Sequence, residues 1–137
     1  MKIFIDTGAF IALTDTDDAN HQSAKDFYKD AVKNGIRFVT TNFVVCETLN
    51  YLRARISHKI AVAFRENLKK SSHFDTVTIL PPVENESFAI FKSYSDKDFS
   101  FTDCTSFAVM NSLKLTKAFA FDRHFEQFGK FERLPKI

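Results

Sequence analysis

Short, mostly apolar runs alternate along the chain with longer stretches whose hydrophobic residues recur at helical spacing. Short apolar runs are typical of strands, and the helical spacing is typical of amphipathic helices. The predicted strands cover residues 3–5, 36–40, 77–80, 118–121 and 131–134. A helical turn is expected from Thr7, and the predicted helices cover residues 20–33, 42–55, 57–70, 83–94 and 102–115. This alternation predicts an α/β fold with a parallel sheet and right-handed crossovers.

The hydrophobic stripes also predict which face of a helix is buried. In the helix at 42–55 the stripe consists of Val45, Leu49, Leu52 and Ile56. In the helix at 83–94 the residues expected to point inward are Phe88, Phe91 and Tyr94. The strand at 77–80 is expected to stop at Pro81 and Pro82, because proline cannot donate a hydrogen bond to a sheet.

Composition narrows the class of protein. The chain has 137 residues, 45% of them hydrophobic, with three glycines and three prolines, so residues 1–137 are expected to form a single domain with little disorder. Without an apolar stretch of about 20 residues or a leader segment, the protein is expected to be cytoplasmic, with no membrane partner. Cys46 and Cys104 fit no zinc motif and are expected to be buried free thiols.

Two aspartates stand directly after predicted strands. Asp6 follows the run at 3–5, and Asp122 follows the run at 118–121. In open α/β sheets, ligands gather beyond the carboxyl ends of the strands, so both side chains can share one rim. Taken singly, each aspartate could equally cap the next helix, since Asp is favoured at N-cap positions.

Glu47 lies in the predicted helix at 42–55, between Phe43 and Tyr51, which are one turn away on either side. An unpaired carboxylate in apolar surroundings costs on the order of several kcal/mol. A metal ion or an arginine would compensate this charge. The alternative is a partly exposed glutamate beside a tyrosine that keeps its hydroxyl in water.

Asp103 lies near the start of the predicted helix at 102–115. The sequence Ser100-x-x-Asp103 approximates a capping box, which explains the residue when it is considered alone. On the helical wheel, however, Asp103 is aligned with Phe107 and Met110 on the inward face. Its carboxylate is therefore also placed to reach a pocket shared with the other acids.

The acidic residues belong to four longer fragments, which are Ile3–Thr7, Thr41–Glu47, Ser100–Cys104 and Phe121–Phe125. In their order and separation, and over essentially the whole chain, these fragments resemble the PIN-domain nucleases. The bacterial members of that family include the VapC toxins of toxin–antitoxin pairs. The resemblance implies a three-layer α/β/α domain around a central, mainly parallel sheet, and an acidic pocket that holds Mg²⁺ or Mn²⁺.

The resemblance also implies roles for individual residues. The positions that match the family's acidic motif, and are expected to bind the metal and act in catalysis, are Asp6, Glu47, Asp103 and Asp122. Thr7 and Thr102 resemble the hydroxyl neighbours that support the pocket. Ala120 departs from the pattern, because many relatives carry a hydroxyl residue two places before the last acid.

The expected activity is that of an endoribonuclease, which hydrolyses phosphodiester bonds of single-stranded or loop RNA with Mg²⁺ or Mn²⁺. Arg123 and His124 are expected to meet the substrate at the rim of the pocket. Arg53 belongs to the densest basic region, which can equally be a solvated face. The net charge of +2 gives no strong field that would by itself identify nucleic acid as the partner.

The toxin resemblance further implies a small antitoxin protein as a partner, and leaves open whether two protomers form a homodimer. Two other functions fit the same residues: a stand-alone RNA-processing PIN nuclease, and a non-catalytic interaction module that binds Mg²⁺. An aspartyl phosphatase fits less well, because Asp6-Thr7-Gly8 lacks the second strand-end aspartate of the haloacid-dehalogenase phosphatases.

Overall fold

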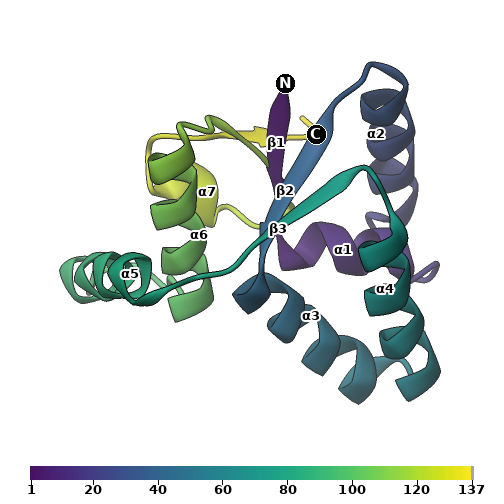
Figure 1. The fold of residues 1–137 in the computed structure, drawn as a ribbon, viewed down its shortest axis with the longest axis horizontal. Coiled ribbons are helices and arrows are strands. Elements are labelled where there is room, and N and C mark those ends of the chain that lie inside the picture. The colour runs from purple at the N-terminus through teal and green to yellow at the C-terminus, as the bar shows by residue number, and fades with distance from the viewer. Residues whose placement is uncertain (137) are drawn as a thin grey trace.

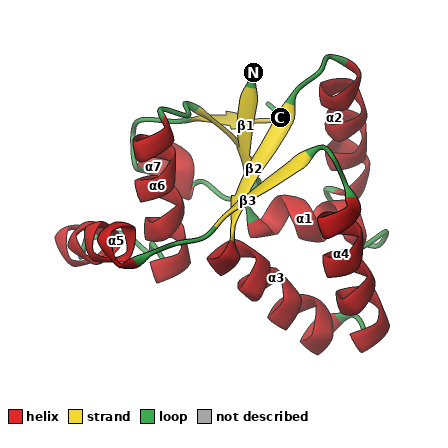
Figure 2. Ribbon diagram, viewed as in Figure 1, coloured by secondary structure: helices red, strands yellow, loops and turns green. Residues whose placement is uncertain are grey.

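The computed structural model describes residues 1–136, and within them a five-stranded, entirely parallel sheet carries helices on both faces (Figures 1 and 2). The strands are β1 (Lys2–Ile5), β2 (Arg37–Thr41), β3 (Phe74–Val77), β4 (Lys117–Phe119) and β5 (Glu132–Leu134). The helices are α1 (Thr7–Thr14), α2 (His21–Lys33), α3 (Asn42–Arg55), α4 (His58–Lys70), α5 (Pro81–Ser93), α6 (Phe101–Leu113) and α7 (His124–Gln127). The predicted α/β class and the three-layer arrangement are confirmed.

The strand order is β3-β2-β1-β4-β5, with β1 at the centre. The chain first builds outward from β1 through β2 to β3, and then returns to add β4 and β5 on the other side of β1. The topological switch point therefore lies at the carboxyl end of β1, where doubly wound sheets bind ligands. The backbone N–H of Asp6 donates to the carbonyl of Phe119 at 3.1 Å, which ties the residue after β1 to the end of β4.

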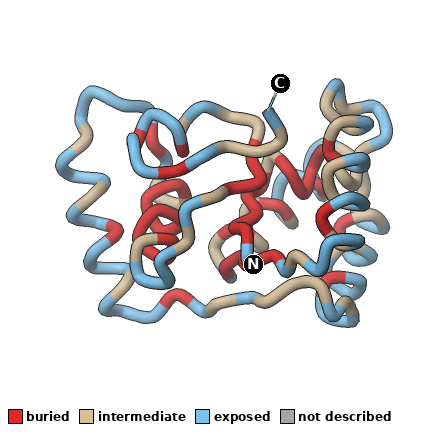
Figure 3. The backbone as a smooth tube through the Cα atoms, turned by 90° about the horizontal axis from the view of Figure 1, so that it is seen from above, coloured by how far each residue is buried: buried red, intermediate tan, exposed pale blue. Residues whose placement is uncertain are grey.

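Alternate side chains of the strands fill the core on both faces of the sheet, and Figure 3 shows buried backbone through the central strands. Phe38 and Phe119 face helix α2, where they pair with the rings of Tyr28 at 5.7 Å and Phe27 at 4.7 Å. Phe4 points the opposite way and packs on Phe125 of α7 at 6.1 Å. Burial on both faces explains why these strands read as continuous apolar runs.

Helix α3 follows β2 without a linker. Thr41 is both the last residue of the strand and the N-cap of the helix, and its Oγ1 accepts the N–H of Val44 at 3.1 Å. The side-chain oxygen of Asn42 accepts the N–H of Ile79 at 2.8 Å and so fixes the chain as it leaves β3. These contacts fix the position of Glu47 relative to the sheet.

The prediction of a strand at 77–80 is wrong by three residues, because the strand is Phe74–Val77. Its position is set by pairing with β2 and by Arg37, whose guanidinium bonds Asp75 at 2.6 Å. Pro81 and Pro82 do not stop a strand but occupy the first turn of α5. Proline is favoured there, because its missing N–H would have no partner in the helix.

The predicted inward face of α5 is wrong for Phe88 and Phe91, whereas Tyr94 does pack against the core, on Phe99 and Phe128. Phe88 is 57% exposed and Phe91 is 45% exposed, whereas Ser87 is fully buried. Helix α5 lies at the edge of the molecule and packs chiefly on α6 (Figure 1), so only one face of α5 is covered. Each helix of residues 1–136 is too short or too polar to cross a lipid bilayer.

Candidate active site

The four acidic residues are carried by different elements at the switch point. Asp6 is the N-cap of α1, Glu47 lies within α3, Asp103 is in the first turn of α6, and Asp122 lies between β4 and α7. Donor atoms of Asp103, Asp122 and His124 all lie within 4.8 Å of one another. Asp6 lies close enough to this group, and to Glu47, for their charges to act on its carboxyl, so residues more than a hundred positions apart meet at one site.

Asp6 is the most deeply buried of the acids, at 3% exposed. Its Oδ1 has no hydrogen-bond partner among the described residues. Burial raises the pKa of Asp6 well above its usual range, the charges of Asp122, Asp103 and Glu47 raise it further, and a hydrogen bond from the backbone of Thr7 opposes the shift. A buried carboxylate that feels three other acids and has a free oxygen is suited to bind a cation.

Asp103 serves both as a helix cap and as a member of the acidic cluster. Its Oδ2 accepts the N–H of Ser100 at 3.0 Å, and Ser100 Oγ accepts the N–H of Asp103 at 3.0 Å, which completes the predicted capping box. Burial is the main cause that raises the pKa of Asp103; the Ser100 hydrogen bond lowers this pKa, and the neighbouring acid Asp122 raises it again. Asp103 therefore caps α6 and also belongs to the acidic cluster.

Glu47 lies at the mouth of the site. The expectation of apolar surroundings for Glu47 is wrong, because α3 buries only the face of Val44, Thr48 and Leu52 and leaves Tyr51 exposed. The predicted stripe of Val45 and Leu49 is only half-buried. Glu47 is itself half-buried and lines a cavity of about 470 Å³ that Thr102 also lines. The alternative prediction, a partly exposed glutamate, therefore describes Glu47.

The two cysteines beside the acids differ from each other. Cys104 is buried, as expected, and burial raises the pKa of its thiol to about 11. Cys46 is exposed on the outer face of α3, so the expectation of a second buried thiol is wrong. The reason is again the orientation of α3, which turns the residue before Glu47 toward solvent.

The residues predicted to support the pocket or to bind the substrate lie in different surroundings. Thr7 is buried beside Asp6, and its Oγ1 finds no partner among residues 1–136. Arg123 is exposed at the N-cap of α7, next to Asp122. Arg53 is not brought to the acids: it lines a different cavity, between α3 and α4, together with His58.

His124 is closer to the acids than a rim position implies. Its Nδ1 lies 2.6 Å from Oδ2 of Asp103 and 3.8 Å from Oδ1 of Asp122. Its backbone N–H donates to Oδ1 of Asp122 at 2.9 Å. The only sequence signal was its spacing of two residues from Asp122, which does not by itself place a ring nitrogen at a carboxylate of another helix.

The raised pKa values predict how stability depends on pH. A carboxyl whose folded pKa exceeds its unfolded value of about 3.9 binds the proton more tightly in the folded state. Its contribution to stability is therefore lost as pH rises from that value through the folded pKa. We expect Asp6→Asn to raise the melting temperature of the metal-free protein, by an amount that grows between pH 4 and pH 7, where about 4 °C corresponds to ~1 kcal/mol.

Calorimetric melting of both proteins in chelator over this range measures the effect. Asp75→Asn is the matched control of opposite sign, because the hydrogen bond from Arg37 lowers the pKa of Asp75. In that variant the melting temperature should fall below that of the unchanged protein as pH rises. Equal melting curves for Asp6→Asn and the unchanged protein at pH 7 would contradict the expected electrostatic strain.

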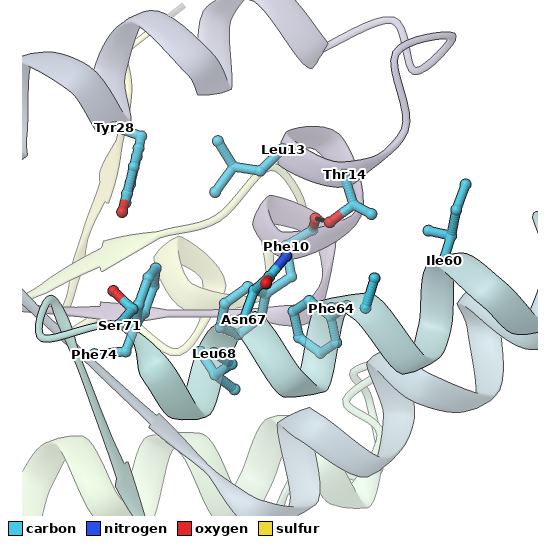
Figure 4. Close-up of a pocket in the computed structure, with 11 residues that line it drawn as sticks. Phe10, Leu13, Thr14, Tyr28, Ile60, Phe64, Asn67, Leu68, Ser71 and Phe74 are labelled. Carbon is cyan, nitrogen blue, oxygen red and sulfur yellow. Dashed lines mark hydrogen bonds between the residues drawn. The ribbon is translucent and has the colours of Figure 1, made fainter.

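A second concavity lies apart from the acids, between α1, α2 and α4 (Figure 4). It has a volume of about 440 Å³ and is lined mainly by apolar side chains, including Phe10, Tyr28 and Phe64. The described residues that line it include no carboxylate. The acidic cluster is therefore the site suited to metal chemistry.

The doubly wound sheet with acids gathered at its switch point is the arrangement of a PIN domain, and the PIN domain family model matches residues 3–131. The chain belongs to the PIN domain family. It is 32% identical over 134 residues to the 23S rRNA-specific endonuclease VapC20 of Mycobacterium tuberculosis, covering 98% of this chain and 99% of that protein. It is also 30% identical to a VapC ribonuclease of Archaeoglobus fulgidus, over 91% of this chain and 80% of the relative.

Solved structures show the same fold. The crystal structure of Mycobacterium tuberculosis VapC20, described as a sarcin-ricin loop cleaving toxin, superposes with a TM-score of 0.87 at 30% identity, over 95% of this chain and 97% of that one. VapBC2 from Rickettsia felis, bound to a DNA fragment from its promoter, superposes with a TM-score of 0.72 over 97% of each chain. At 8% identity the second likeness supports the fold alone.

Proposed function

We propose that this protein is an endoribonuclease that depends on a divalent cation, Mg²⁺ or Mn²⁺, and that Asp6, Glu47, Asp103 and Asp122 are its catalytic acids. The observation that carries the proposal is the free Oδ1 of Asp6, which is buried next to carboxylates that raise its pKa. A divalent cation would satisfy that oxygen and neutralise the cluster. Membership of the PIN domain family supports the same chemistry.

The role that we propose for each residue follows from its position in the site. Asp6 and Asp103, both buried, would hold the cation, with Asp122 binding directly or through water. When bound, the cation would orient a water for attack and stabilise charge on the phosphoryl oxygens. Glu47, at the mouth of the site, would face the incoming water and substrate. Thr7 and Thr102 would orient the carboxylates next to them.

The substrate we propose is ribosomal RNA of the large subunit, at an exposed loop. Support comes from the relative that matches nearly the full chain, whose name specifies 23S rRNA and whose structure is described as that of a sarcin-ricin loop cleaving toxin. Loop nucleotides can leave their stack and enter a pocket, which a paired strand cannot do. Arg123, exposed beside Asp122, is placed to meet the phosphate backbone.

We propose that the protein is the toxin of a toxin–antitoxin pair and acts in the cytoplasm. An enzyme that cuts ribosomal RNA would harm its own cell, so it must be held inactive by a small protein partner. The stand-alone RNA-processing nuclease is the second candidate, and absence of growth arrest on expression would favour it. A non-catalytic Mg²⁺-binding module would bind the cation and leave RNA intact.

The test is a cleavage assay with the metal-free protein and intact ribosomes or purified 23S rRNA. We expect no cleavage in chelator, and a discrete large fragment after addition of Mg²⁺ or Mn²⁺, mapped by primer extension. Ca²⁺ serves as a control for charge alone, because it binds carboxylates with a looser geometry. Cleavage that persists unchanged in chelator would rule out the proposed metal dependence.

A further inference from the structure

We infer that Nδ1 of His124 is itself a metal ligand, alongside Asp103 and Asp122, so that this site selects Mn²⁺ over Mg²⁺. The inference rests on the proposed function, because it concerns the same cation. It goes beyond the four acids by adding a nitrogen donor. Its consequence is a preference between metals, which a set of carboxylates alone would not produce.

The distances around Nδ1 suit a ligand. Nδ1 of His124 is 2.6 Å from Asp103 Oδ2 and 3.8 Å from Asp122 Oδ1. Ligands around an ion with bonds of about 2.1 Å are separated by about 3.0 Å in octahedral and 3.4 Å in tetrahedral geometry. The two measured separations lie on either side of these values. All three donors lie within 4.8 Å of one another, so small shifts of their side chains would place one ion between them.

The close approach of His124 to Asp103 is not a well-directed hydrogen bond. Nδ1 is a buried atom with no hydrogen-bond partner among residues 1–136, although Asp103 Oδ2 is 2.6 Å away. That oxygen already accepts the N–H of Ser100. At this distance Nδ1 and Oδ2 need a positive charge between them, which is either the proton of a His–Asp ion pair or a metal cation. Together with the free Oδ1 of Asp6, the unpaired Nδ1 points to an ion in this volume.

The imidazole is held in place by its surroundings. The backbone N–H of His124 is bonded to Asp122, so the side chain starts from a fixed position. The ring packs edge-on against buried Phe99, with centroids 5.6 Å apart. The next residue, Phe125, is fully buried and fixes the start of α7. A fixed ligand loses little conformational freedom on binding a metal.

The types of donor atom determine which ion binds more tightly. Mg²⁺ takes oxygen ligands in a nearly ideal octahedron and keeps several waters. Mn²⁺ also accepts carboxylates, and although it is the weakest binder of the first-row divalent series, it takes an imidazole nitrogen more readily than Mg²⁺ does. Replacing one oxygen donor by imidazole therefore favours Mn²⁺. The carboxylates of Asp103 and Asp122 keep enough oxygen character for Mg²⁺ to bind more weakly.

The experiment detects the nitrogen directly. Electron spin echo envelope modulation of Mn²⁺ bound to the full chain, prepared once with natural-abundance and once with ¹⁵N-labelled histidine, reports any imidazole nitrogen bonded to the ion. We expect a modulation that changes with the label and is absent in His124→Gln. His58→Gln is the matched control, because His58 is exposed on α4 and should leave the signal unchanged.

Calorimetric titration gives the second readout. His124→Gln should weaken Mn²⁺ binding by about tenfold or more, the lower end of the loss seen when even a partner of a metal ligand is removed, and Mg²⁺ binding by less. Mn²⁺ bound without nitrogen modulation in the unchanged protein would overturn the inference and leave the proposed nuclease intact. Absence of Mn²⁺ and Mg²⁺ binding, with cleavage in chelator, would overturn both. Since the decisive spectrum is that of the unchanged protein, misfolding of the variant would not obscure the result.

Discussion

Asp6→Asn is expected to abolish RNA cleavage, lowering the rate by at least ~100-fold, which exceeds the usual loss from removing a partner of a metal ligand. The amide keeps the size of the side chain but removes the negative charge that would hold the cation. Asp6 is the best position for this test, because it is the most buried of the acids and its Oδ1 lacks a partner among the described residues. Single-turnover cleavage of the RNA at saturating Mn²⁺ measures the effect.

The matched control is Asp30→Asn, which makes the same chemical change on an exposed residue of α2. It should cleave at the unchanged rate. Expression in cells provides a second readout, because the unchanged protein and the control should arrest growth and Asp6→Asn should not. Full activity of an Asp6→Asn variant that still unfolds in one cooperative transition would show that the acidic cluster is not the catalytic centre.

Phe107→Ala is expected to destabilise the protein by about 3–5 kcal/mol, the usual cost of emptying a buried aromatic site. Phe107 is fully buried on α6 and contacts four aromatic rings, at 4.5 Å to 6.0 Å. Those rings belong to Phe99, Phe125, Phe128 and Phe131. The cluster ties α6, which carries Asp103, to α7, which carries His124. Unfolding in urea, followed by circular dichroism, measures the change.

Phe88→Ala removes the same side chain from an exposed position of α5 and is the control for Phe107→Ala. Its unfolding free energy should change by less than about 0.5 kcal/mol, as for most surface substitutions. A comparable loss in both variants would show that Phe88 is covered in solution, for example by a second protomer. A small loss in Phe107→Ala would contradict the close packing between α6 and α7.

The parts of the site that follow β-strands could be predicted from sequence, because two local signals coincided there. The runs before Asp6 and Asp122 are apolar, which indicates a parallel sheet, and ligands gather where such strands end. The strand before Asp122 ends at Phe119, two residues earlier than predicted. The capping box at Ser100 and Asp103 is likewise local. For these residues a short segment of chain contains most of the information that positions the side chain.

Positions that depend on a neighbouring element could not be predicted in this way. The periodicity of α5 suggests that Phe88 faces inward, but α5 is covered chiefly by α6 and leaves that side in water. The face of α3 is likewise offset, which exposes Cys46 and half-exposes Glu47. His124 approaches Asp103 only through the packing of α7 on α6. Each of these outcomes depends on which partner a helix finds, and one sequence does not contain that pairing explicitly.

The pairing of the last strands with the first has a consequence for synthesis. Asp6 precedes β4 in the chain by more than a hundred residues, and β4 can pair with β1 only after the intervening elements have been made. A nascent or truncated chain that ends before β4 would lack one wall of the acidic cluster. Completion of the acidic cluster thus depends on the docking of β4 beside β1, so the elements up to β3 cannot form the cluster by themselves.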